Sequence, residues 1–154
     1  MSYLVVKWLH ILSSTVLFGT GLGSAYYMFF ASRTGDARTV ATVVRYVVVA
    51  DWLFTTTTIV LQPLTGLWLA HLAHFPLTSA WIFWSFVLYF VAGACWLPVV
   101  AIQIRMRRLA DAAAAREAPL PPEYRTCFRI WTALGVPAFV ALVIVFWLMV
   151  AKPT

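Results

Sequence analysis

Charged residues divide this sequence into long uncharged stretches. Residues 8–32, 52–104 and 130–151 contain no Asp, Glu, Lys or Arg. A run of about 20 apolar residues spans the hydrocarbon core of a bilayer, which is about 30 Å thick. The first and last stretches are each long enough to cross a membrane once, and the middle one is long enough to cross it twice.

Four crossings predict an all-α fold, an integral membrane four-helix bundle with antiparallel up-down topology. The helix break in the middle stretch falls near Pro76, because the residue before a proline disfavours helical backbone. We expect a single transmembrane domain over residues 1–154, with helices at about 4–31, 40–73, 79–108 and 123–150. The polar residues 105–125 form a helical extension followed by a proline-rich turn.

Composition agrees with a membrane protein. Hydrophobic residues make up 63% of the chain and charged residues 10%, whereas a soluble domain carries about 25% charged residues. The net charge of +6 does not predict nucleic-acid binding, because the basic residues flank the apolar stretches. Such residues more often face anionic lipid headgroups, so the bilayer is the expected partner.

The distribution of basic residues predicts an orientation. All the arginines lie in or beside the first and third loops, and the lysines, Lys7 and Lys152, lie near the two ends of the chain. The positive-inside rule therefore places these loops in the cytoplasm and both termini in the periplasm. We expect a multi-pass protein of the bacterial inner membrane.

Polar residues inside the predicted helices are the candidate functional residues, because polar groups in hydrocarbon are costly. The first helix carries a face of small and polar residues that includes His10, Ser14 and Gly21. Close helix packing is one explanation of the small residues. It does not explain the histidine.

The second helix carries a polar stripe at spacings of three and four. Most of it is expected to be structural, because threonines in membrane helices bond their own backbone carbonyls. Near the cytoplasmic end of the stripe, an ion pair between its aspartate and Arg45 is the simplest prediction. The stripe consists of Asp51, Thr55, Thr58, Gln62 and Thr65.

Three histidines are the most informative feature. His10 lies near the start of the first helix, and His71 and His74 lie near the end of the second. Because consecutive helices run antiparallel, all three are predicted near the same membrane face. Two kinds of site fit this arrangement: a metal ion held by His10, His71 and His74, or a haem with histidine axial ligands. Alternatively, His71 and His74 are interfacial residues without a ligand.

The haem hypothesis assigns a role to each candidate. His10 is the first axial ligand of the iron and His71 the second, with His74 as its alternative. The absence of a CxxCH motif excludes a c-type haem, so the expected cofactor is haem b. The other predicted cofactor-binding residues are Ser14, Gly21 and Trp84.

The opening helix resembles a known group of membrane proteins. Residues 3–12 (YLVVKWLHIL), followed by a glycine-bearing helix, resemble the first helix of HemJ-type proteins and of CopD-like membrane domains. Residues 62–66 (QPLTG) look most like an uncharacterised bacterial four-helix family, a domain of unknown function related to these. The HemJ resemblance implies a b-type haem, protoporphyrinogen oxidation and His10 as a ligand. HemJ proteins also use basic residues in later helices, and residues 52–104 contain none.

The sequence therefore predicts a haem-binding membrane protein with a redox or electron-transfer role, acting on quinone or porphyrin. Haem, a quinone and a redox partner protein are the corresponding partners, and a homo-oligomer remains open. One alternative is a non-enzymatic assembly protein or small-molecule binder. The other is a histidine-ligated metal site near the periplasmic face.

Overall fold

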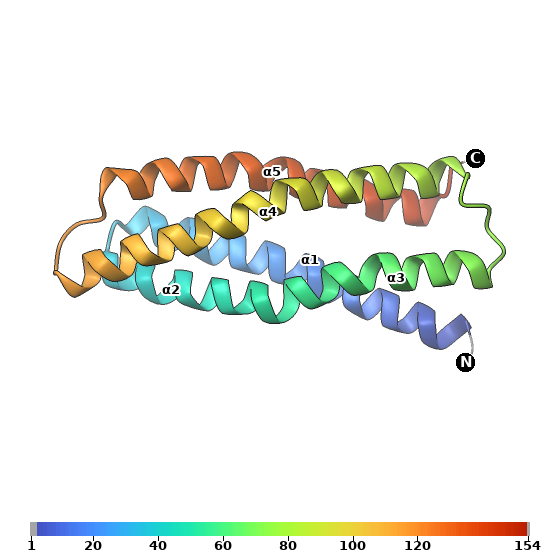
Figure 1. Ribbon diagram of the computed structural model, residues 1–154, viewed down its shortest axis with the longest axis horizontal. Coiled ribbons are helices and arrows are strands. Elements are labelled where there is room, and N and C mark those ends of the chain that lie inside the picture. Colours follow the sequence, from blue (N-terminus) through green and yellow to red (C-terminus); the bar gives the residue numbers. More distant parts are fainter. Residues whose placement is uncertain (1–2, 154) are drawn as a thin grey trace.

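A computed structural model describes residues 3–153, and these residues form helices and connecting loops without a strand. Six helical elements form four long rods, because the second, third and fourth elements follow one another without a break and together make the second rod (Figure 1). The rods run alternately up and down, which confirms the predicted all-α, four-helix antiparallel fold. The elements are α1 (Tyr3–Thr34), α2 (Ala37–Ala50), the π-helical turn η1 (Asp51–Thr55), α3 (Thr56–Leu72), α4 (Ala80–Ala115) and α5 (Pro122–Ala151).

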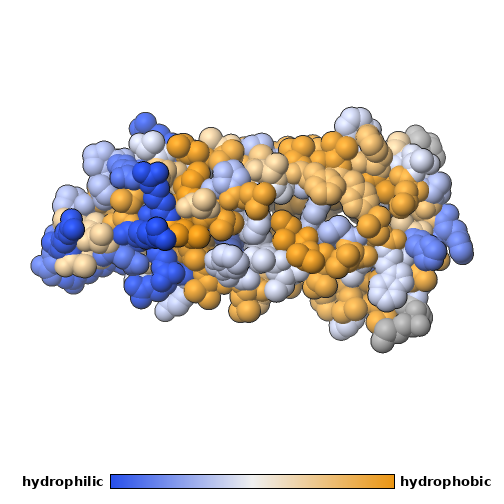
Figure 2. Space-filling view, viewed as in Figure 1, coloured by the Kyte–Doolittle hydropathy of each residue, from blue (hydrophilic) through white to orange (hydrophobic). Residues whose placement is uncertain are grey.

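All four rods are long and apolar enough to span a membrane. The two longest contain 36 residues each. At about 1.5 Å per residue they exceed the hydrocarbon thickness of about 30 Å, so their ends extend into the polar zones. Figure 2 shows the matching surface, with a broad hydrophobic band around the middle and hydrophilic residues concentrated at one end.

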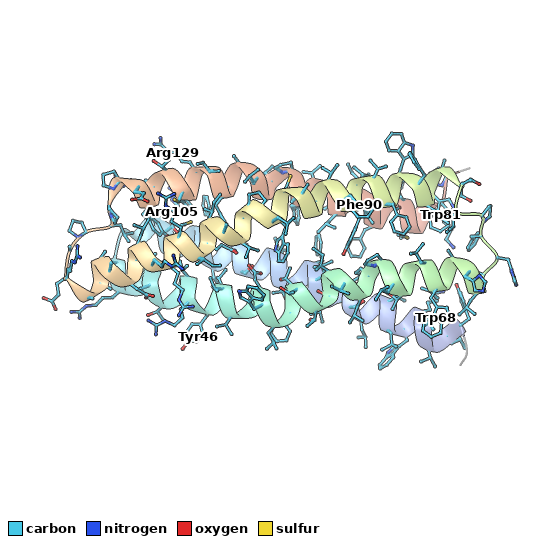
Figure 3. All side chains as sticks on the ribbon, viewed as in Figure 1. Tyr46, Trp68, Trp81, Phe90, Arg105 and Arg129 are labelled. Atoms are coloured by element: carbon cyan, nitrogen blue, oxygen red, sulfur yellow. The ribbon has the colours of Figure 1, made fainter. Side chains whose placement is uncertain are left out.

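The two ends of the bundle differ in charge. Arg105 and Arg129 lie toward the end that carries the first and third loops, and Trp68 and Trp81 lie toward the opposite end (Figure 3). We call these the arginine end and the terminal end, since the first and last described residues lie at the latter (Figure 1). At the terminal end the ammonium group of Lys152 lies 4.9 Å from the ring centroid of Phe75.

Three helix boundaries differ from the sequence prediction by three residues or more, and the first is the end of α1, at Thr34 rather than near 31. The second rod begins at Ala37, because Asp36 caps α2 by accepting a 2.8 Å hydrogen bond from the backbone N–H of Thr39. Hydrogen bonds from Thr39 hold the pKa of the Asp36 carboxyl below its usual value. Helix α4 continues to Ala115 rather than ending near 108, because alanine has the highest helix propensity. Asp111 of this extension also pairs with Arg45.

The arginine half of the bundle is well packed. Its core contains Met28, Val40, Val44, Met106 and Tyr124, contributed by four different helices. The Tyr124 hydroxyl is also joined to that of Ser32 by a 2.7 Å hydrogen bond. This half holds α1, α2, α4 and α5 together.

The terminal half is more open. There α1 packs along α3 and α4 packs along α5, whereas α3 has no extended contact with α4 or α5. Figure 1 shows the resulting separation between the α1–α3 pair and the α4–α5 pair. The bundle is therefore closed at one end and divided into two helix pairs at the other.

One side chain links the two pairs at the point where they separate. Pro63 has no N–H, so the carbonyl of Ile59, four residues earlier in α3, loses its helical partner. The Tyr89 hydroxyl of α4 donates a 2.5 Å hydrogen bond to this carbonyl. The hydroxyl of Tyr89, 26 positions after Pro63 in the chain, thus replaces the backbone donor that the proline lacks.

Replacing Tyr89 by phenylalanine is expected to lower the free energy of unfolding by about 1 kcal/mol, because the Ile59 carbonyl then has no donor inside the bundle. Thermal unfolding in detergent, followed by circular dichroism, measures the change. Tyr27→Phe is the control, because the Tyr27 side chain is 65% exposed. Equal stability of the two variants would show that the Tyr89 bond contributes nothing.

Candidate functional site

Two cavities follow the division between the helix pairs. One, of about 460 Å³, lies in the terminal half and is lined by residues that include His10, Ser14, Gln62, Gly66 and Tyr89. We call it the histidine cavity. The second, of about 540 Å³, lies nearer the arginine end and is lined by residues that include Asp51, Thr55, Gln103 and Tyr89. We call it the aspartate cavity. Because Tyr89 lines both, they meet at the link between the helix pairs.

The polar centre of the histidine cavity is His10. Its Nδ1 lies 2.7 Å from the hydroxyl oxygen of Thr65 on α3. That hydroxyl has one proton, and it donates this proton to the Leu61 carbonyl at 2.6 Å. Thr65 must therefore accept a hydrogen bond from His10, which places the imidazole proton on Nδ1. The other ring nitrogen, Nε2, keeps its lone pair.

Gln62 fixes the backbone on which His10 sits. Its side-chain nitrogen donates to the His10 carbonyl at 3.0 Å and to the Ser13 hydroxyl at 2.5 Å. Ser13 in turn donates to the His10 carbonyl at 3.1 Å. Both protons of the Gln62 amide are thus used to hold α1 against α3. The helix position and the ring position of His10 are fixed by separate hydrogen bonds.

Gly66 makes room for the imidazole ring. A Cβ atom added at Gly66 would lie 3.4 Å from Cε1 of His10, whereas one added at Gly19 would meet no atom within 4 Å. The ring of His10 therefore lies directly over the backbone of α3 at Gly66. A Cβ atom at this position would be in van der Waals contact with the ring, so a larger side chain would be built directly beside it.

His71 and His74 do not lie in this cavity. Both side chains are exposed, and neither residue lines either cavity. The face of α3 toward the cavity includes Gln62, Gly66 and Ala70, and His71 is rotated by about 100° from Ala70 because a helix has about 3.6 residues per turn. His74 follows the end of α3 in a left-handed backbone conformation.

The three histidines therefore share one end of the bundle without forming one site. Within residues 3–153 no group of three or more His, Cys, Asp or Glu residues is placed to hold a metal ion. The structure does not bring His10, His71 and His74 together around one metal ion, as the sequence had suggested. Topology brings residues to the same membrane depth, but the rotation of each helix decides which side chains meet.

The other predicted cofactor-binding residues separate in a similar way. Ser14 lines the histidine cavity, as the small face of α1 suggests. Gly21 lines the aspartate cavity instead, because it lies two turns farther along α1. Trp84 lines neither cavity, and 54% of its surface is exposed on the outside of the bundle.

The expected ion pair between Asp51 and Arg45 is absent. Arg45 pairs instead with Asp111, at 3.2 Å. Asp51 follows Arg45 by six positions, which places the two residues on different faces of the same helical rod. Asp51 is buried and accepts a 2.9 Å hydrogen bond from the Thr55 hydroxyl.

The hydrogen bonds of two residues in the site could not be predicted from the sequence. The aromatic ring of Tyr89 suggests a residue that lines a cofactor site, but its hydrogen bond to Ile59 does not follow from the sequence, although Pro63 indicates that some donor must reach that carbonyl. Thr65 belongs to the polar stripe, but its role as the acceptor for His10 depends on the contact between α1 and α3. A proline in a membrane helix frees one backbone carbonyl, and a search for distant hydroxyl groups that could bond it would have suggested Tyr89.

The chain matches over residues 4–153 a family described as predicted integral membrane protein (DUF2269). It therefore belongs to this family, whose function is not defined by its description. No curated protein and no solved structure matches the chain.

Gly66→Leu is expected to destabilise the fold by about 1–3 kcal/mol, because the new side chain would collide with the His10 ring and separate α1 from α3. Gly19→Leu is the matched control, since a side chain at Gly19 meets open space. Unfolding by titration with SDS compares the two variants. Equal loss of stability in both would contradict the packing of His10 on Gly66.

Proposed function

We propose that this member of the DUF2269 family binds one b-type haem in the histidine cavity, with His10 as an axial ligand of the iron. A redox or electron-transfer role in the membrane follows from this proposal. The observation that carries it is the hydrogen bond between His10 and Thr65, which leaves Nε2 with a free lone pair beside the cavity. Histidines that ligate metals commonly donate their other ring N–H in this manner.

The chemistry of the cavity fits this cofactor. The walls are mostly apolar, and the volume of about 460 Å³ falls within the usual range for small-molecule sites, about 300–1,000 Å³. Lys7 and Lys152 also line the cavity, and lysines can hold the anionic carboxylate groups of a haem. Bound haem would supply reversible one-electron chemistry. The protein would supply the ligand, its orientation and an apolar surrounding.

The proposal differs from the sequence prediction in its second ligand. His71 and His74 are exposed and line neither cavity, so they are not included as ligands. His10 is then the one histidine within residues 3–153 that lines the cavity. Within this proposal His10 would hold the haem, and quinone or porphyrin would be the membrane-soluble redox partner.

A second candidate function is a non-enzymatic small-molecule binder. The observation that favours it is the same cavity with one histidine in place of two. The Nε2 lone pair can accept a hydrogen bond from the hydroxyl group of a lipid-soluble molecule, without iron. Such a protein would be colourless under all growth conditions.

We also propose that the arginine end faces the cytoplasm of a bacterial inner membrane and the terminal end faces the periplasm. This orientation is supported by the arginines that gather around the first and third loops. The histidine cavity would then lie in the periplasmic half of the membrane. Within the proposal, the similarity of residues 3–12 to the first helix of HemJ-type proteins further supports His10 as the ligand.

The absorption spectrum of the protein purified from haem-supplemented cells tests the proposal. We expect a Soret band in the wild type and its loss in His10→Ala. In a His10→Gly variant, added imidazole should restore the band, because it can occupy the space left by the missing ring. The restored band distinguishes loss of a ligand from loss of the fold.

His71→Ala and His74→Ala are the matched controls, and both should keep the Soret band at full intensity. A colourless wild-type protein would contradict haem binding and favour the small-molecule candidate. Loss of the band in His71→Ala would show that the second ligand is His71 and that the cavity assignment is incorrect.

A further inference from the structure

The aspartate cavity has aromatic walls. Eight of its lining residues are aromatic, contributed by α1, α4 and α5, and they include Phe18, Tyr89, Trp96 and Trp131. Aromatic rings carry negative charge on their faces, so a cation beside them is stabilised, and more strongly when water is excluded. A cavity of about 540 Å³ built in this way can attract a positively charged apolar molecule.

One acidic side chain lies at the edge of this aromatic cavity. Asp51 is 6% exposed, and it lines the cavity together with Thr55 and Gln103. Its carboxyl accepts a hydrogen bond from Thr55. Within residues 3–153, no Lys, Arg or His forms a salt bridge with it. An ionisable residue inside a membrane protein without a protein counter-ion is a candidate ligand-binding group.

The local backbone supports this interpretation. Asp51 and Thr55 begin and end the π-helical turn η1. A π-helical turn is rare, and such turns occur often at functional sites. Both Asp51 and Thr55 are buried. A regular helix already spaces residues four apart on one face, so the feature that requires explanation is the turn itself.

The cavity can be reached from the lipid. Helices α1 and α5 both line the cavity, and their backbones approach one another over only a short length, where Phe18 of α1 packs against Phe139 and Phe146 of α5. Arg45 lies six residues before Asp51, about 9 Å along the rod at about 1.5 Å per residue. Arginines near that end disfavour entry of a cation from the arginine end. An apolar cation dissolved in the membrane avoids them by entering between α1 and α5.

We propose that the aspartate cavity binds a lipophilic organic cation, of the quaternary ammonium or phosphonium class, with Asp51 as its counter-ion and the aromatic rings as its walls. Asp51 supplies the charge that distinguishes a cation from a neutral molecule of the same shape. The aromatic rings supply the affinity for its apolar groups. This inference does not depend on haem binding, because it uses a different cavity.

Equilibrium dialysis of the purified protein in nonionic detergent with tetraphenylphosphonium tests the proposal. The wild type should bind it saturably, with one site per chain. Triphenylphosphine oxide has similar aromatic groups without the charge, and it should not compete. Asp51→Asn should weaken binding by more than about tenfold, as expected when a buried counter-ion is removed.

Asp36→Asn is the matched control, because Asp36 is exposed and lies outside both cavities. His10→Ala should also bind the cation normally, which separates this proposal from the haem proposal.

Asparagine can still accept the hydrogen bond from Thr55, so Asp51→Asn is expected to fold, and its thermal unfolding verifies this. If Asp51→Asn does not fold, the comparison of charged and neutral ligands on the wild type decides. No saturable binding, competition by the neutral compound, or undiminished binding by a folded Asp51→Asn would overturn the proposal.

Discussion

The structure depends on the requirement that every backbone polar group inside a membrane finds a partner within the protein. Long helices meet this requirement except where a proline interrupts the ladder. Pro63 interrupts the ladder in α3, and the freed Ile59 carbonyl accepts a hydrogen bond from Tyr89 of the other helix pair, which joins the two pairs. This bond lies where the packed arginine half changes to the divided terminal half, and both cavities include Tyr89 in their walls.

The hydrogen bonds that hold α1 against α3 also form the site around His10. Helix α3 is joined to α1 by the bonds of Gln62 and Thr65, both of which end on or beside His10. These bonds stabilise the helix pair and also orient the imidazole. Gln62 and Thr65 belong to a stripe that was expected to be mostly structural in its own helix. They also orient His10, the proposed ligand, on α1.

Much of the fold could be predicted from the sequence, because the cost of charges in hydrocarbon marks where each helix crosses the membrane. His10 could be singled out for the same reason. The orientation of His71, the partner of Arg45 and the role of Tyr89 could not. Each depends on helix rotation about its axis, and rotation is decided by contacts between helices far apart in the chain. The aspartate cavity depends on four helices and the turn at Asp51 together.

The proposed site depends on the Thr65 hydroxyl, which keeps the proton of His10 on Nδ1 and leaves the lone pair of Nε2 available. This tautomer can be measured by nitrogen-15 NMR of histidine-labelled protein purified without haem, with the His10 signals assigned by comparison with His71→Gln and His74→Gln variants. We expect a neutral His10 ring with a protonated Nδ1 and an unprotonated Nε2. A ring protonated on Nε2, or one that exchanges freely between the two tautomers, would contradict it.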